Sequence, residues 1–216
     1  MSRDGAFVGR VGELAAMGGE LDRVRSGQPR VLWLSGPAGI GKTSLVRRAL
    51  VDQPGVCVLW GSGEEGETGL AFGVLAQLVA DVPHRLRRPL LAAGPAPDAD
   101  PLAVGTELLA VLGGLQAAGP VVIVVDDAQW VDDATGRALV FVGRRLRRDQ
   151  VLVVVVARDD TAPEAAWWER GLTQDHLVRR VRLRGDPEGM LGGSGARLRA
   201  NQRRRWEARS VRPRRE

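Results

Sequence analysis

Apolar residues gather in short runs along the chain, and the longer stretches between the runs repeat an apolar position every three to four residues. Runs rich in Val, Leu and Ile are typical of buried strands in a parallel sheet, and the longer period is typical of amphipathic helices. We predict strands at residues 31–35, 56–60, 121–126 and 151–157, with a weaker fifth strand at 178–183. We predict helices at residues 11–25, 43–51, 71–82, 102–118 and 134–148.

The order of these elements predicts the fold class. Strands that alternate with helices indicate an α/β fold, in which helices cover both faces of a parallel sheet. Residues 92–101 are rich in Pro and Asp and are predicted to form a surface loop. From about Gly185 the periodic pattern ends, and Gly and Arg dominate. We therefore predict one domain at residues 1–184 and a disordered basic tail at 185–216.

The charge is unevenly distributed between these two parts. The formal net charge is +5, yet residues 1–178 hold 18 basic and 22 acidic side chains, a net of −4. Residues 179–216 hold 13 Arg and four acidic side chains, a net of +9. We favour a solvated run with no partner for this tail, and weak, salt-dependent binding of nucleic acid is the alternative.

The composition excludes several classes of protein. Cys57 is the only cysteine, so the chain cannot form an internal disulfide framework or a cysteine-based metal site. No apolar run approaches the roughly 20 residues that span a bilayer, and the first residues lack the apolar segment of a secretion signal. These features predict a cytoplasmic protein that does not interact with membranes.

A glycine-rich segment, "GPAGIGKTS" at residues 36–44, carries the strongest chemical signal. It fits the pattern G-x-x-x-x-G-K-[ST] and lies between a predicted strand and a predicted helix, as a phosphate-binding P-loop requires. Lys42 is the only lysine in the chain, and its compact ammonium suits the β- and γ-phosphates, while the Thr43 hydroxyl suits Mg²⁺. The predicted phosphate-binding residues are Gly36, Pro37, Ala38, Gly39, Ile40, Gly41, Lys42, Thr43 and Ser44.

A second segment, "VVIVVDDAQWVDD", ends a predicted strand with two acidic residues. We predict that Asp126 is the carboxylate that holds the Mg²⁺ shell, and that Asp127 orients and deprotonates the water that attacks the nucleotide phosphate. Asp is one methylene shorter than Glu, so we expect slow turnover and a switch more than a motor. A cap or loop carboxylate is the alternative for Asp127, and for Asp132 and Asp133 we favour the role of helix N-caps.

Arg158 follows the predicted strand at residues 151–157. If this strand lies between the P-loop strand and the acidic strand, Arg158 stands beside the γ-phosphate and senses its presence. The alternative is an exposed arginine paired with Asp159 or Asp160.

Together, "FVGR" (residues 7–10), the P-loop, "GLAFGVLAQLV", "VVIVVDDAQWVDDATGRAL" and "VLVVVVARDD" resemble the AAA-16, or Orc1-like, ATPase domain. This domain occurs at the N-terminus of large ATP-binding LuxR-type transcriptional regulators, which are similar to the STAND class that includes MalT-like regulators. The resemblance runs from about residue 7 to residue 183.

The resemblance implies a P-loop NTPase fold of the ASCE type, with strand order 5-1-4-3-2, and ATP with Mg²⁺ as ligands. It implies that Lys42 and Thr43 contact phosphate and Mg²⁺, that Asp126 binds Mg²⁺, and that Asp127 and Arg158 act in catalysis. It also implies that four residues lie near the adenine: Phe7, Val8, Gly9 and Arg10. From the residues alone, Phe7 and Val8 are equally well explained as a hydrophobic staple ahead of the first helix.

We expect an ATP-binding switch domain that hydrolyses ATP slowly and lacks the sensor and DNA-binding regions of the LuxR-type regulators. The change near Gly185 favours a truncated or frameshifted product. The alternatives are a nucleic-acid-binding protein that uses the tail, and a stand-alone ATPase that self-associates or binds protein partners. The last would use a basic edge formed by Arg144, Arg145, Arg147 and Arg148, although for these residues we favour a solvated helix end whose cations suit the helix dipole.

Overall fold

Five parallel strands form the centre of the computed structural model, which describes residues 10–51, 53–159, 171 and 177–184. Their order across the sheet is β2-β3-β4-β1-β5, which confirms the predicted order 5-1-4-3-2 and the α/β class. The strands are β1 (Arg30–Ser35), β2 (Cys57–Ser62), β3 (Val121–Asp126), β4 (Val151–Val156) and β5 (Val178–Arg182). The tail and Phe7, Val8 and Gly9 lie outside the described residues.

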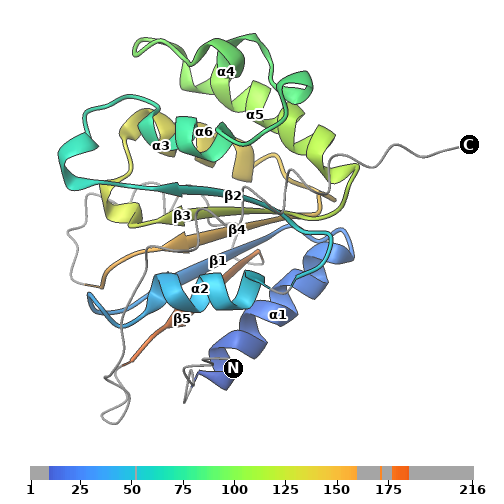
Figure 1. Ribbon diagram of the computed structural model, residues 1–216, viewed down its shortest axis with the longest axis vertical. Helices are drawn as coiled ribbons and strands as arrows, with labels where there is room; N and C mark the ends of the chain where they lie inside the picture. Colours follow the sequence, from blue (N-terminus) through green and yellow to red (C-terminus); the bar gives the residue numbers. More distant parts are fainter. Residues whose placement is uncertain (1–9, 52, 160–170, 172–176, 185–216) are drawn as a thin grey trace, which may run out of the picture. The chain divides into compact units, whose positions relative to one another are not determined.

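Helices cover both faces of the sheet (Figure 1). One face packs on α1 (Val11–Arg25) and α2 (Lys42–Val51), and the other packs on α3 (Gly73–Val79), α5 (Pro101–Gln116) and α6 (Asp133–Gly143). A short helix, α4 (Pro89–Ala93), packs beside α5. None of the described helices is long and apolar enough to cross a membrane.

The central strands β3 and β4 are apolar throughout because both of their faces are covered. Successive side chains of a strand point to opposite faces. Val122 and Val124 accordingly pack with α1 and α2, while Ile123 and Val125 pack with α3, α5 and α6. All four are fully buried, so the register between β3 and β4 is fixed by two separate cores.

Two predicted helices are shorter than the sequence pattern indicated. The helix predicted at residues 71–82 begins at Gly73, because Phe72 adopts a left-handed backbone with φ of 62°. The helix predicted at 134–148 ends at Gly143, where the chain enters a turn closed by the bond from Arg145 N–H to the Val142 carbonyl, 2.8 Å.

The loop predicted at residues 92–101 is shorter as well, since α4 occupies its first two residues and α5 begins at Pro101. Asp100 caps α5 by accepting a hydrogen bond from Leu102 N–H, 2.9 Å. Three single 3₁₀ turns complete the described elements: η1 (Glu65–Glu67), η2 (His84–Leu86) and η3 (Ala128–Trp130).

Candidate nucleotide-binding site

The glycine-rich segment forms a loop between the carboxyl end of β1 and the first turn of α2. Gly39 and Gly41 have left-handed φ values of 72° and 89°, a region that side chains disfavour. A Cβ at either position would meet no protein atom within 4 Å. A glycine-rich turn that leads into the N-terminus of a helix is an arrangement that can bind a phosphate group.

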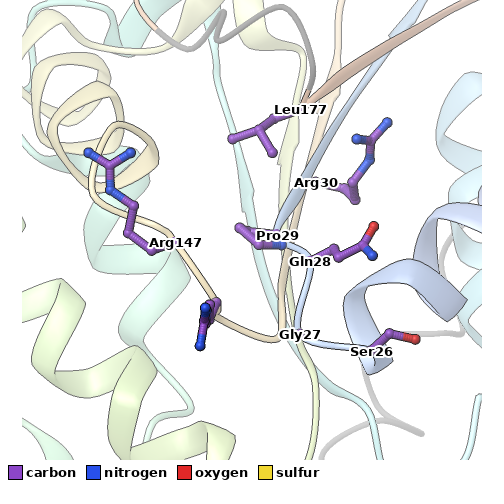
Figure 2. A pocket seen from close by; sticks show the side chains of 8 residues that line it. Ser26, Gly27, Gln28, Pro29, Arg30, Arg147 and Leu177 are labelled. Atoms are coloured by element: carbon purple, nitrogen blue, oxygen red, sulfur yellow. The ribbon is translucent and has the colours of Figure 1, made fainter.

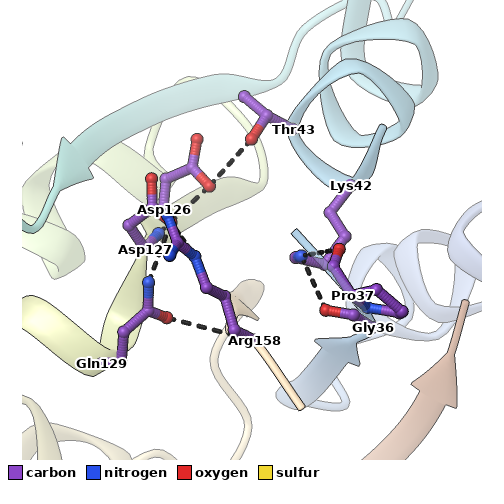
Figure 3. A network of polar contacts seen from close by, with 8 residues as sticks. All are labelled: Gly36, Pro37, Lys42, Thr43, Asp126, Asp127, Gln129 and Arg158. Carbon is purple, nitrogen blue, oxygen red and sulfur yellow. Dashed lines mark hydrogen bonds and ion pairs between the residues drawn. The ribbon is translucent and has the colours of Figure 1, made fainter. Parts of the chain in front are cut away.

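Lys42, the first residue of α2, directs its ammonium back into this loop (Figure 3). Its Nζ donates to the carbonyl oxygens of Gly36 and Pro37, both at 2.9 Å. Only 8% of the residue is exposed, and burial lowers the pKa of the ammonium, although Asp127, Asp159 and Asp126 oppose this shift. The single lysine of the chain is therefore held at the mouth of the loop.

Asp126 ends β3 beside the first turn of α2 (Figure 3). Its Oδ1 accepts from the Thr43 hydroxyl and from Asp127 N–H, both at 3.1 Å. None of the described residues donates to its Oδ2, and burial raises the pKa of this carboxyl. A hydroxyl beside a carboxylate oxygen is a donor set that fits Mg²⁺.

No group of three or more His, Cys, Asp or Glu among the described residues would hold a metal alone. A Mg²⁺ ion at Thr43 and Asp126 would thus need oxygen ligands from outside the protein, such as phosphates and water, which is usual for this ion.

Asp127 begins the turn after β3, and Arg158 follows β4. Their side chains are about equally exposed, at 41% and 40%, and Arg158 Nε lies 3.9 Å from Asp127 Oδ1. Asp159 pairs instead with Arg182, 2.8 Å. Burial raises the pKa of Asp159, but the hydrogen bonds from Arg182 and Ser35 outweigh it, and the net shift is downward. Arg158 thus faces the acidic turn, as expected for a strand between β1 and β3.

Asp132 is a helix cap, as the sequence predicted, and it has a further role that the sequence did not reveal. Its Oδ1 accepts from Thr135 N–H at the start of α6, 2.8 Å. The same carboxylate accepts from Phe72 N–H and Val74 N–H at the start of α3, 2.8 and 3.3 Å. Asp133 is not a cap: it lies in the first turn of α6 and pairs with Arg137, 2.8 Å.

Sequence reasoning gave no role to Gln129, although the side chain lies inside the site. Its Nε2 donates to Asp127 Oδ1, 2.9 Å, and its Oε1 accepts from Arg158 N–H, 3.2 Å. The available signal was its place in the acidic segment that carries the family resemblance, two residues after Asp127. Of the residues predicted near the adenine, only Arg10 is described, and its guanidinium pairs with Glu13, 2.8 Å.

A pocket of about 520 Å³ lies at the opposite end of the strands from the P-loop, where β1 begins (Figure 2). It is lined by residues 26–30, Arg147, Arg148 and Leu177, and none of the predicted nucleotide-binding residues contributes to it. We assign the candidate site to the carboxyl ends of β1 and β3, because the groups predicted to bind phosphate and Mg²⁺ meet there and not at the pocket. Arg147 and Arg148 belong to the predicted basic edge, whereas Arg145 lies over the Phe141 ring, 3.4 Å from its centroid.

Comparison with known proteins gives the same result as the geometry. Residues 6–155 match the family model AAA_16, described as an AAA ATPase domain. No curated protein matches the chain. Among solved structures, the Aeropyrum pernix Orc1 protein in complex with DNA matches with a TM-score of 0.54 and 16% identity, over 92% of this chain and 49% of that one. Drosophila ORC bound to DNA matches with a TM-score of 0.44 and 10% identity, over 79% and 89%.

The chain thus spans about half the length of the Aeropyrum pernix protein, and an identity this low shows a shared fold alone. The family model covers well over half of the 216 residues and includes both the P-loop and the acidic strand. The chain belongs to the AAA ATPase domain family.

Proposed function

We propose that this domain binds Mg-ATP at the P-loop edge of the sheet and hydrolyses it slowly, as a nucleotide-gated switch. The observation that carries the proposal is the hydrogen bond between Thr43 and Asp126, which joins the P-loop helix to the acidic strand. Two segments 83 residues apart thereby bring an ammonium, a hydroxyl and two carboxylates to one edge of the sheet.

Each side chain has a distinct task in this proposal. Lys42 turns from the loop carbonyls to phosphate oxygens, and the loop N–H groups bind the same phosphates. Thr43 and Asp126 hold Mg²⁺, which neutralises developing phosphate charge when bound. Asp127 orients and deprotonates the attacking water, and Arg158 contacts the terminal phosphate and reports its loss.

Slow turnover follows from the short acidic side chain at position 127. Asp reaches one methylene less far than the Glu common in ATPases, and here its Oδ1 already accepts a hydrogen bond from Gln129. A water held at poor distance or angle reacts slowly, because catalysis depends steeply on position. Slow hydrolysis suits a switch, in which the bound nucleotide sets a long-lived state.

For the wider context we propose the ATPase head of a LuxR-type, STAND-like regulator, on the basis of the sequence resemblance. Its DNA-reading and sensor regions would be encoded beyond this chain. Reading all three frames of the gene through codon 185 and downstream tests this: a resumed helical array with a helix-turn-helix supports it. The absence of such a frame would contradict it.

Binding of Mg-ATP is tested by titration of the full chain, with Lys42→Ala as the decisive variant. We expect Lys42→Ala to weaken ATP binding by about 10³-fold, because a desolvated charge–charge contact with the phosphates is lost. Arg137→Ala removes an exposed cation of α6 and serves as the control, with affinity unchanged. Equal affinities for Lys42→Ala and the parent chain would contradict the proposal.

Nucleic-acid binding is the second candidate, since the Aeropyrum pernix Orc1 structure contains DNA and residues 179–216 carry a net charge of +9. Residues 1–178 carry a net charge of −4, so affinity for a polyanion would come from the basic residues that follow. Deletion of residues 185–216 should then abolish salt-dependent DNA binding and leave ATP binding unchanged.

A further inference from the structure

Gln129 joins the acidic turn after β3 to the end of β4 (Figure 3). Its amide nitrogen donates to Asp127 Oδ1, 2.9 Å, and its amide oxygen accepts from Arg158 N–H, 3.2 Å. The opposite amide orientation would place its NH₂ group against the Arg158 N–H and its oxygen against the carboxylate. Only the observed orientation satisfies both neighbours.

The backbone beneath Asp127 is fixed independently of Gln129. Its N–H donates to Asp126 Oδ1, 3.1 Å, its carbonyl accepts from Trp130 N–H, 2.9 Å, and its φ is 45°. Gly63, after β2, packs so closely that a Cβ there would lie 2.7 Å from the Asp127 carbonyl oxygen. Because the backbone is held, the carboxylate position depends on side-chain torsions, and Gln129 restrains these.

We propose that Gln129 is a positioning residue that sets the orientation of the Asp127 carboxylate and ties it to the strand end that carries Arg158. This inference rests on the proposed function, in which Asp127 orients the attacking water. A hydrogen bond to a carboxylate is short and directional, so it defines one rotamer of a short side chain. Displacement of Arg158 would thereby reach Asp127 through the Gln129 amide, in addition to the direct approach of Arg158 Nε to Asp127 Oδ1 at 3.9 Å.

Single-turnover hydrolysis of Mg-ATP by the full chain tests the positioning role. We expect Gln129→Met, which keeps the side-chain length without polar groups, to slow hydrolysis about tenfold while the Kd for ATP stays within about twofold. Asp127→Asn should slow it more, and the double variant should match Asp127→Asn alone. Effects that multiply would overturn the proposal, because Gln129 would then act independently of Asp127.

A second measurement needs no nucleotide. In ¹H–¹⁵N spectra, the Gln129 side-chain amide signals are identified by their loss in Gln129→Met. Asp127→Asn should shift them, since their acceptor loses its charge. Asp133→Asn is the matched control, because Asp133 pairs with Arg137 on α6, and it should leave them in place. Signals that do not respond to Asp127→Asn would overturn the inference.

The outcomes separate this inference from the proposed function. If the chain fails to bind Mg-ATP, the proposed function fails, while the spectra still decide whether the Gln129–Asp127 bond exists. If the chain hydrolyses Mg-ATP and Gln129→Met hydrolyses it at the parent rate, the proposed function stands and the positioning role is overturned.

Discussion

Asp126 and Asp132 are two buried carboxylates on either side of the same turn, and their surroundings differ. They are 4% and 2% exposed. Three backbone N–H groups, from Phe72, Val74 and Thr135, donate to Asp132 and use both of its oxygens. The donors to Asp126, Thr43 and Asp127, both reach Oδ1, and none of the described residues donates to Oδ2.

The difference agrees with a structural role for Asp132 and with the proposed Mg²⁺-binding role of Asp126. A buried charge is tolerated when hydrogen bonds replace its hydration, and Asp132 meets this condition within the protein. Asp126 accepts two hydrogen bonds, both at Oδ1, and burial raises its pKa. A carboxylate with one oxygen not used by these donors, next to a P-loop, is suited to a cation.

Substitution of Asp132 should give the largest loss of stability. Asp132→Ala would leave three backbone donors at two helix starts without their acceptor, and we expect a loss of about 3 kcal/mol in the free energy of unfolding. Asp132→Asn should lose less, because one acceptor oxygen remains. Urea denaturation measures both, with Asp133→Ala as a control that stays within about 0.5 kcal/mol. A loss for Asp132→Ala as small as that of Asp133→Ala would show that Asp132 is not a structural carboxylate, and its contrast with Asp126 would fail.

A smaller loss is expected at Thr135, which lies beside Asp132 in the same cluster. Its hydroxyl is buried and accepts from Leu75 N–H at the start of α3, 3.2 Å. Thr135→Val keeps the shape and removes the acceptor, so we expect a loss of about 1–2 kcal/mol, also by urea denaturation. Thr135→Ser should retain most of the hydrogen bond, and equal losses for Val and Ser would assign the effect to packing.

The smallest change, and one of opposite sign, is expected at Asp126. Because burial raises its pKa, the folded state binds this proton more tightly than the unfolded state, and stability falls as pH rises through the raised pKa. Asp126→Asn should therefore stabilise the nucleotide-free chain by about 0.5–1 kcal/mol at pH 7 and weaken Mg²⁺-dependent ATP binding. The stability gain should shrink as pH is lowered towards the ordinary pKa of Asp. An Asp126→Asn variant that is less stable than the parent chain at pH 7 would contradict this prediction.

The parts of the fold that follow from local sequence were predicted well. The runs of Val in β3 and β4 are buried on both faces. The P-loop conformation follows from the glycines at positions 39 and 41, which have positive φ values, and from Lys42 at the start of the helix. The strand order came from the family resemblance, not from periodicity. Strand β5 was the weakest signal because three of its five residues are Arg, which an edge strand tolerates.

The parts that were not predicted depend on contacts between distant segments. The start of α3 is set by Asp132, 60 residues further along the chain, which binds the N–H of Phe72. The role of Gln129 depends on Arg158, 29 residues away, and nothing in the local sequence indicates that pairing. The roles of Lys42, Asp127 and Arg158 in catalysis, and of residues 7–10 at the adenine, stay predictions.

The double cap at Asp132 also has a mechanical consequence. One carboxylate holds the first turns of both α3 and α6, and α3 packs on the edge strand β2. A rotation of the turn after β3 would therefore move the start of α3 with it. Because α3 packs on β2, the edge strand would be displaced as well, through the hydrogen bonds of a single side chain.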